Sequence, residues 1–205
     1  MPDLICLEGP DGVGKSTYIS LIKEALEKEG YKVHVFAEPS DSPIGKLIRD
    51  IIKNDVPPEE KAPQLFHLFM ADRYESEKRW ANLPDEDIVL LDRGTLSTLV
   101  YQVPAFPSHL RYVVSQLAAR SFPRYDLLVH LMDSHEAIHE RLTSRSKDSG
   151  ERVPSKEEIH ELCGRYWKTR KKWWDKVARK RLTVSLQDKT PSTVVEEIIS
   201  SIKEI

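Results

Sequence analysis

The sequence predicts an α/β domain of three layers, in which a five-stranded parallel sheet carries helices on both faces. Short apolar runs alternate along the chain with stretches of helical periodicity, which is typical of buried parallel strands joined by crossover helices. The 205 residues contain no repeat, low-complexity tract or linker-like segment. Because this length suits one domain, we expect residues 1–205 to form a single unit.

Five apolar runs are the expected strands. They are Leu4 to Leu7, Val33 to Phe36, Ile88 to Leu91, Leu127 to Leu131 and Leu182 to Leu186. In sheets of this kind, ligands bind beyond the carboxyl ends of the strands. Glu38 follows the second run, and Asp92 and Arg93 follow the third. Polar side chains therefore gather at the edge where a site is expected.

Three helices have recognisable starts. Ser155 and Glu158 form a capping-box pattern that predicts a helix through about Ala178. Ser108 can cap a segment that runs to Ala119, and Pro191 suits the first turn of a C-terminal helix.

Composition narrows the classes of function. A net charge of −2 argues against bulk nucleic-acid binding and favours small anionic ligands. Cys6 and Cys163 are too few and too far apart for a disulfide framework or a metal quartet, so we expect neutral thiols in a reducing compartment. The first residues lack a signal-peptide pattern, and no apolar run approaches the roughly 20 residues of a membrane span. We expect a soluble, cytoplasmic protein that contacts no membrane.

A glycine-rich loop predicts binding of a nucleoside triphosphate with Mg²⁺. "GPDGVGKS" fits the pattern G-x-x-x-x-G-K-[ST], between an apolar run and a helix-period run. Its backbone N–H groups converge on phosphate oxygens, Lys15 bridges the same oxygens, and Ser16 offers its hydroxyl to Mg²⁺. The expected ATP contacts are Gly9, Pro10, Asp11, Gly12, Val13, Gly14, Lys15, Ser16 and Thr17. A carboxylate in such a loop repels phosphate, so Asp11 needs a separate explanation.

Asp92 and Arg93 end the third run and have two interpretations. They can form a surface ion pair that caps the strand. Alternatively, Asp92 holds Mg²⁺ through water and Arg93 neutralises the transferring phosphoryl group, since this strand end is expected beside the loop.

The segment "LFHLFMADRYE" is helical by period and places Phe69 and Arg73 on one face, four residues apart. Arg73 either extends to water from an apolar stripe or meets a flat base stacked on Phe69. Arg49, on the helix after the second strand, is either a solvated basic residue or a phosphate contact.

Residues 139–155 leave a helix and enter a basic and polar segment without apolar periodicity. Such segments normally form mobile surface loops. We expect a basic lid at about residues 142–154 that closes over the triphosphate and stabilises charge during transfer. Its candidate cations are Arg141 at ATP, Arg145 and Arg152 at the reacting phosphates, and Lys147.

Two further patterns favour ordinary packing. The basic helix at residues 164–181 has three tryptophans, but Trp167, Trp174 and Val177 recur near helical spacing and can pack inward while Lys and Arg stay in water. We therefore expect no nucleic-acid partner. "HEAIH" at 135–139 matches a zinc-protease pattern, yet five residues match easily and no third ligand stands out.

Taken together, the motifs resemble the thymidylate kinases, which are P-loop nucleoside monophosphate kinases that convert dTMP and ATP to dTDP and ADP. The resemblance spans essentially the whole chain. It rests on "LEGPDGVGKST", "EPSDSPIGKLIR", "LFHLFMADRYE", "LLDRGTLSTLVYQ", the basic lid and the C-terminal helix after "DKTPSTVVEEI". It implies the P-loop NTPase fold, Mg²⁺ as cofactor, and a homodimer.

The resemblance also assigns roles. Asp11 is expected at the sugar 3′-hydroxyl of the acceptor, Phe69 stacked on thymine and Arg73 at the thymine edge. Arg93 is expected to bridge the acceptor and donor phosphates. The other implied acceptor contacts are Glu38, Arg49, Ser97, Thr98 and Tyr101.

The chain departs from the family pattern at three positions. Ala37 stands where many bacterial members carry an arginine, Gly94 replaces the tyrosine of Asp-Arg-Tyr, and Gly12 replaces an arginine found in some members. The first two changes leave open a broad-specificity deoxynucleoside monophosphate kinase. The third makes the lid arginines the natural source of positive charge.

Two other functions stay open. A deoxynucleoside kinase phosphorylates a 5′-hydroxyl, with a glutamate that resembles Glu38 as the base; the segment Asp92-Arg93-Gly94 with Ser97 and Thr98 fits that family less well. A nucleotide-dependent switch without an acceptor lacks its guanine-reading Asn-Lys-x-Asp stretch here.

Overall fold

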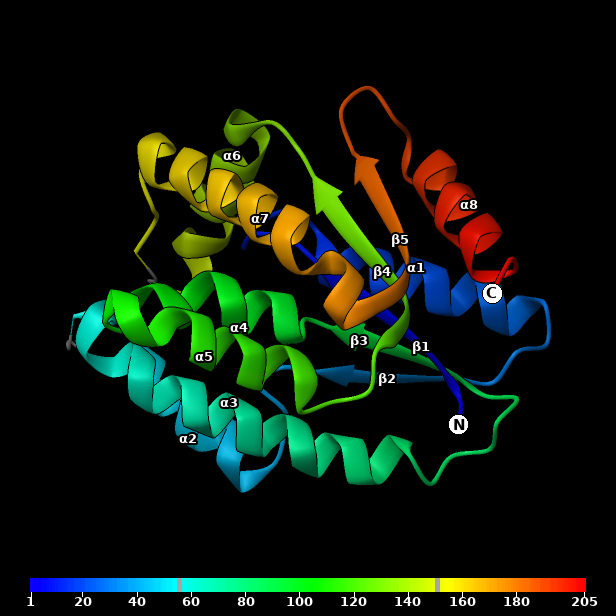
Figure 1. The fold of residues 1–205 in the computed structure, drawn as a ribbon. Coiled ribbons are helices and arrows are strands. Elements are labelled where there is room, and N and C mark those ends of the chain that lie inside the picture. Colours follow the sequence, from blue (N-terminus) through cyan, green and yellow to red (C-terminus); the bar gives the residue numbers. More distant parts are fainter. Residues whose placement is uncertain (55–56, 150–151) are drawn as a thin grey trace.

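The computed structural model describes residues 1–54, 57–149 and 152–205. Its centre is a parallel five-stranded sheet in the order β2-β3-β1-β4-β5 (Figure 1). The strands are β1 Asp3–Glu8, β2 Val33–Ala37, β3 Ile88–Asp92, β4 Tyr125–Met132 and β5 Ala178–Ser185. The predicted fold class is confirmed.

Helices cover both faces of this sheet. They are α1 Lys15–Lys28, α2 Pro43–Lys53, α3 Pro58–Trp80, α4 Thr95–Tyr101, α5 Ser108–Arg120, α6 His135–Ser149, α7 Lys156–Val177 and α8 Pro191–Ile202, with a short 3₁₀ turn at Val103–Ala105. One hydrophobic core joins the sheet to α1, α6 and α8. A second core joins the other face to α3, α4, α5 and α7. The alternation of side chains along each strand supplies both cores, so the sheet is buried on both sides.

Register brings the ends of the central strands together. Leu7 of β1 is paired with Asp92 of β3, and Glu8 is paired with His130 of β4. The loop that follows β1 therefore lies between the carboxyl ends of β3 and β4, where parallel sheets bind ligands.

Two of the three expected helix starts are confirmed, and one differs. The capping box of Ser155 and Glu158 forms as predicted, and Pro191 occupies the first position of α8. Ser108 was expected as a cap but is the first residue of α5, preceded by Pro107, and it makes no side-chain cap. The helix expected through about Ala178 ends at Val177, and β5 begins at Ala178.

The loop expected after residue 139 is a helix as far as Ser149. Ile138 and Leu142, four residues apart, are buried in the core beside the phosphate loop. This two-residue apolar contact holds α6 in place, but it is too short to stand out as periodicity in the sequence. Of the predicted lid at about residues 142–154, Gly150 and Glu151 lie outside the described residues.

The basic helix α7 packs differently from the prediction. Trp174 and Val177 are buried as expected, and Trp173 is buried with them, but Trp167 is 40% exposed. Arg170 is buried, with its guanidinium between the Trp167 and Trp174 rings. Stacking on two indoles and a hydrogen bond to Thr183 offset the loss of hydration of this cation, which pairs with no carboxylate among the described residues.

Both cysteines are free thiols. Burial raises the pKa of Cys6 and of Cys163, so both are neutral as expected. Among the helices described, none has the length and apolarity needed to cross a membrane.

Candidate active site

The phosphate loop joins β1 to α1 at the sheet edge described above. Gly14, immediately before α1, has a φ of 107°, in the left-handed region that glycine adopts at little cost. Lys15 is buried, and its Nζ donates to the carbonyls of Gly9 at 3.0 Å and Pro10 at 2.9 Å. Burial and the nearby Arg93 lower the pKa of Lys15 to about 8. A cation is thus held over the loop.

Ser16 and Asp92 meet where β1 and β3 end. The Ser16 hydroxyl donates to Asp92 Oδ2 at 2.7 Å. The two oxygen-bearing residues that were expected at a metal are therefore adjacent, although they lie 76 positions apart in sequence. In the described part of the chain, no cluster of three His, Cys, Asp or Glu residues is arranged to hold a metal.

Asp11 and Arg93 form an ion pair that links the loop to the end of β3. Asp11 also accepts from the Tyr101 hydroxyl at 3.0 Å. Burial alone would raise the pKa of Asp11, but Arg93, Lys15 and the hydrogen bond from Tyr101 lower it to about 2, with a further contribution from Arg145. The side chain of Asp11 therefore points toward Arg93 and the helix α4 as a carboxylate.

Arg93 has a φ of 75°, which is uncommon for a residue with a side chain. It donates to Ser97 and to the Tyr166 hydroxyl, each at 3.2 Å. Strained backbone at a strand end is typical of functional residues that their surroundings hold in place.

Two residues that hold Arg93 in place were not predicted. Glu8 is fully buried and accepts from the backbone N–H groups of Gly94 and Ser97 at 3.0 Å and from the Ser97 hydroxyl at 2.6 Å, which fixes the turn after β3. Burial raises its pKa. The position of Glu8, an acid ending an apolar strand just before the loop, was an available signal. Tyr166 had none, because α7 is rich in aromatic residues throughout.

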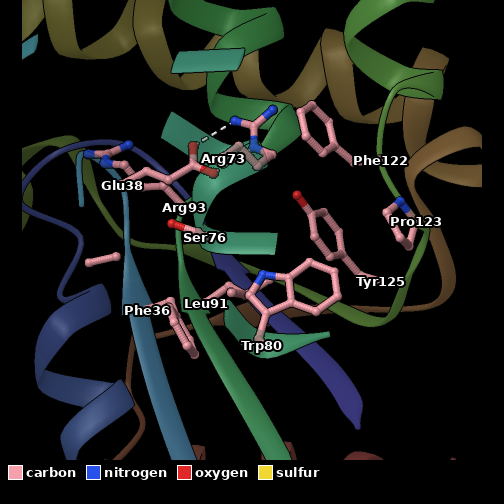
Figure 2. Close-up of a pocket in the computed structure, with 11 residues that line it drawn as sticks. Phe36, Glu38, Arg73, Ser76, Trp80, Leu91, Arg93, Phe122, Pro123 and Tyr125 are labelled. Atoms are coloured by element: carbon pink, nitrogen blue, oxygen red, sulfur yellow. Dashed lines mark hydrogen bonds and ion pairs between the residues drawn. The ribbon is translucent and has the colours of Figure 1, made fainter. Parts of the chain in front are cut away.

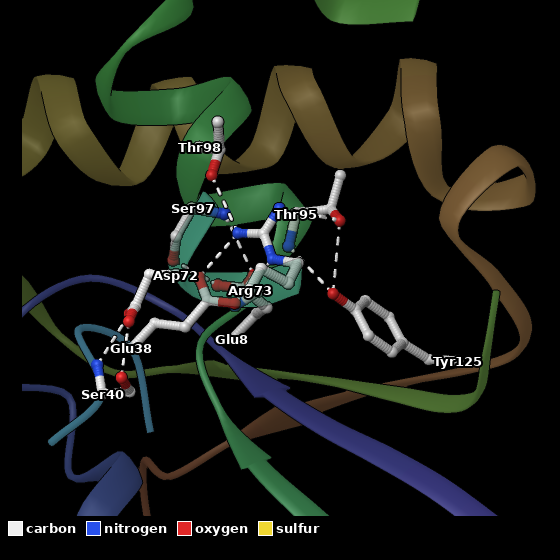
Figure 3. A network of polar contacts seen from close by, with 10 residues as sticks. Glu8, Glu38, Ser40, Asp72, Arg73, Thr95, Ser97, Thr98 and Tyr125 are labelled. Carbon is white, nitrogen blue, oxygen red and sulfur yellow. Dashed lines mark hydrogen bonds and ion pairs between the residues drawn. The ribbon is translucent and has the colours of Figure 1, made fainter. Parts of the chain in front are cut away.

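Arg73 belongs to α3 and is almost fully buried. Its Nε and Nη2 bind the two oxygens of Glu38 at 2.5 and 2.6 Å. It also donates to Thr98 at 2.9 Å and Thr95 at 3.4 Å (Figure 3). The Phe122 ring lies over its guanidinium, 5.1 Å from Cζ.

Arg73, Glu38 and Phe122 border a cavity of about 20 Å³ beside the ends of β2 and β3 (Figure 2). Trp80, Leu91 and Tyr125 line its apolar side. Arg73 does not extend to water, so the first of its two interpretations is wrong. Phe69, on the same face of α3, packs with Ile48 and Leu65 and is 9% exposed.

Arg49 braces the segment after β2. Its Nη1 donates to the carbonyls of Pro39 at 3.0 Å and Ser40 at 2.8 Å. Asp72, which was not predicted, is fully buried and accepts from the backbone N–H and hydroxyl of Ser40. The Glu38 segment is thereby tied to both α2 and α3.

The cations of the expected lid divide into two groups. Arg141 pairs with Asp133 and donates to the carbonyl of Gly12 at 3.2 Å, so it lies against the phosphate loop. The charge of Arg145 contributes to the lowered pKa of Asp11. Arg152 binds both oxygens of Glu158 at 2.8 Å at the start of α7, and Lys147 is exposed. The structure thus brings Arg141 and Arg145 to the site and holds Arg152 in another ion pair.

Comparison with known proteins gives consistent results. The sequence model of the family described as thymidylate kinase matches residues 7–190. A probable thymidylate kinase of Methanobrevibacter smithii is 41% identical over 49% of this chain and 52% of that protein, so the match spans about half the length of this relative. A thymidylate kinase of Campylobacter jejuni is 32% identical over 72% of this chain and 73% of that protein.

A solved structure supports the fold. The thymidylate kinase of Candida albicans superimposes with a TM-score of 0.75, covering 99% of this chain and 92% of that one, at 21% identity. The family model covers residues 7–190, and the Campylobacter jejuni relative is covered over more than two thirds of its length. This chain is a member of the thymidylate kinase family.

Proposed function

We propose that this protein transfers the γ-phosphoryl group of ATP to the phosphate of dTMP, giving dTDP and ADP for the supply of dTTP. The observation that carries the proposal is the ion pair of Asp11 and Arg93. It joins the donor's phosphate loop to the turn that begins α4, whose residues face the buried Arg73. Two nucleotides bound on either side of this pair would meet phosphate to phosphate.

Mg²⁺ is the proposed cofactor, and the residues present fit it. The Ser16 hydroxyl and the Asp92 carboxylate, 2.7 Å apart, are hard oxygen donors of the kind that Mg²⁺ prefers. When bound there with ATP, the ion would neutralise charge on the β- and γ-phosphate oxygens.

The chain's own residues supply positioning and charge. Lys15 leaves the loop carbonyls to bind β- and γ-oxygens, and Arg93 neutralises the phosphoryl group between donor and acceptor. Arg141 and Arg145 approach from α6, while Arg152 must release Glu158 to take part. Phosphoryl transfer needs little covalent help from the protein, so in-line placement and charge carry the catalysis.

The acceptor is proposed to lie along α3 and α4. Asp11 receives the sugar 3′-hydroxyl, Phe69 stacks on the base, and Arg73 donates to its edge. Glu38 holds Arg73, and Arg49 holds the backbone of the Glu38 segment. Ser97, Thr98 and Tyr101 are proposed to line the same pocket. They are hydrogen-bonded to Arg93, Arg73 and Asp11, respectively.

Glu38 argues against a deoxynucleoside kinase. That reaction needs Glu38 as a base for a 5′-hydroxyl, but both of its oxygens bind Arg73. Broad acceptor choice among deoxynucleoside monophosphates remains the second candidate, favoured by Ala37 and Gly94.

A homodimer is the proposed assembly, and the cytoplasm the proposed location. α5 exposes Leu110, Val113 and Leu117 at helical spacing, with exposed fractions of 41%, 62% and 52%, and Tyr112 beside them at 60%. A continuous apolar stripe of this kind is typical of a protein–protein contact surface.

The test is a coupled assay of ADP release with ATP and a panel of acceptors: dTMP, dUMP, dCMP, dGMP and thymidine. The proposal expects rapid release with dTMP and little with thymidine. Turnover with thymidine alone would support the deoxynucleoside kinase instead, and equal turnover with all monophosphates would support the broad-specificity enzyme. ADP release that ignores every acceptor would indicate a switch.

A further inference from the structure

Gly94 is a glycine because Tyr125 occupies the space beside it. Its φ of −174° is ordinary extended backbone, which any residue adopts. A Cβ at this position, however, would overlap Tyr125 Oη and lie 2.9 Å from Cζ and 3.1 Å from Cys6 Sγ. Position 94 lacks an aromatic side chain, and the Tyr125 ring from β4 occupies the adjacent space instead.

The hydroxyl of Tyr125 binds the first residue of α4. It accepts the backbone N–H of Thr95 at 3.0 Å and lies 3.2 Å from Thr95 Oγ1 (Figure 3). The first N–H groups of a helix have no partner within the helix, so this bond fixes where α4 begins. Tyr125 is 3% exposed, and burial raises its pKa, which keeps it a neutral phenol.

Thr95 connects Tyr125 to Arg73. An arginine has five N–H groups and no acceptor. Four of those in Arg73 are engaged: Nε and one of Nη2 by Glu38, the other of Nη2 by Thr98, and one of Nη1 by Thr95. Among the residues that the structure describes, the fifth, on Nη1, has no partner. The Thr95 contact therefore sets the direction of the one donor left for a ligand.

We propose that Tyr125 is a positioning residue for recognition of the acceptor base, acting through Thr95 on the free Nη1 donor of Arg73. This inference rests on the proposed function, since it assigns the base edge to that donor. A 4-oxo pyrimidine presents an acceptor to it, whereas a 4-amino pyrimidine presents a donor. Tyr125 thereby favours dTMP over dCMP.

The first experiment replaces Tyr125 with phenylalanine, which keeps the ring and removes the hydroxyl. Loss of one neutral hydrogen bond from the network is expected to raise the KM for dTMP by about three- to tenfold. The KM for ATP and the kcat at saturation should change less than about twofold, because the phosphate loop is untouched. The ratio of kcat/KM for dTMP over dCMP should fall by a similar factor.

The matched control is Tyr31→Phe, which removes a hydroxyl from a 40% exposed ring on the surface. It should leave all these constants unchanged. Equal effects of Tyr125→Phe on both substrates, or an unaltered dTMP to dCMP ratio, would show that Tyr125 only stabilises the fold. If the unaltered protein fails to use dTMP at all, the proposed function fails instead, and the two results are distinguishable.

A double-mutant cycle tests the steric half of the inference. Gly94→Ala alone should lower the melting temperature and the activity, because the new methyl group overlaps Tyr125. Gly94→Ala combined with Tyr125→Ala should be no less stable than Tyr125→Ala alone. If the effects of the two substitutions on stability are additive, positions 94 and 125 are not in steric conflict, and the inference is wrong.

Discussion

At the residue scale, Arg93 is the group expected at the transferring phosphoryl group, and its surroundings hold it in a left-handed conformation between Asp11 and Tyr166. Arg93→Ala is expected to lower kcat by about 10³-fold or more, because an arginine at a transferring phosphoryl group is worth roughly 10³ to 10⁵ in rate. Single-turnover kinetics and circular dichroism measured together would separate chemistry from folding. A folded variant with near-normal turnover would remove Arg93 from its assigned role.

The carboxylate of Asp11 is predicted to serve the acceptor, whereas its backbone belongs to the loop that holds the donor. Its carboxylate turns from the phosphate loop toward Arg93 and Tyr101. Asp11→Ala should therefore raise the KM for dTMP by about 10- to 100-fold, the value of a hydrogen bond to a charged group. The Kd for ATP, measured by calorimetry, should change much less. A larger loss for ATP than for dTMP would overturn this assignment.

The lowered pKa of Lys15 predicts that ATP binding depends on pH. A polyphosphate binds the protonated amine, and the pKa of Lys15 in the free protein is about 8. Below pH 8 the cation is already present; above it, binding must take up a proton, so affinity falls by up to about tenfold per pH unit. Calorimetry from pH 7.5 to 9.5 checks the slope. Lys15→Arg, which stays charged, should bind with no such slope; an equally flat profile in the unaltered protein contradicts the prediction.

At the scale of elements, α6 packs directly on the phosphate loop. Gly12 has a φ of 79°, and a Cβ there would lie 2.7 Å from Leu142 Cγ and 3.1 Å from the Ile138 carbonyl. A side chain such as arginine does not fit at position 12, because α6 fills that space. Arg141, which belongs to α6, places a cation against the loop instead.

Gly12→Ala should consequently destabilise the protein by about 1–3 kcal/mol, from the left-handed backbone and the overlap with α6. Gly164→Ala is the matched control, since a Cβ in that helical position meets nothing within 4 Å. It should stabilise by about 0.5–1 kcal/mol. Urea denaturation of both variants measures the difference, and equal stabilities would show that α6 does not rest on the loop.

Elements were predictable to the extent that they leave periodic patterns. The five strands and the capping box of α7 follow from apolar runs and a four-residue signature. The extension of α6 to Ser149 did not, because among residues 140–147, whose burial is described, only Leu142 is fully buried. The early start of β5 was hidden because Arg179, Lys180 and Arg181 continue the basic character of α7 into an edge strand.

At the scale of the whole molecule, the topology of the sheet determines which residues meet in the site. The phosphate loop, Asp92, Arg93 and Glu38 could be predicted because strand ends in a parallel sheet share one edge. Glu8 ends a strand at the same edge and carried the same signal, although it was not predicted. Asp72, Tyr125 and Tyr166 could not be predicted, because their partners are distant in sequence: Tyr166 bonds Arg93 across 73 positions. Such contacts form only when the chain folds, so no local sequence pattern predicts them.

The exposed stripe on α5 predicts a homodimer. Val113→Lys places a charge at its centre, and light scattering is expected to show a monomer for this variant and a dimer for the unaltered chain. Tyr31→Lys, on a different surface, should remain a dimer. A monomeric unaltered protein would contradict the prediction.

The acceptor proposed for this protein is the phosphate of dTMP. The most direct measurement follows the label from [γ-³²P]ATP incubated with the protein, Mg²⁺ and dTMP, or with thymidine in its place. The account predicts labelled dTDP with dTMP and no labelled dTMP with thymidine. Label recovered as inorganic phosphate, or as dTMP formed from thymidine, would contradict it.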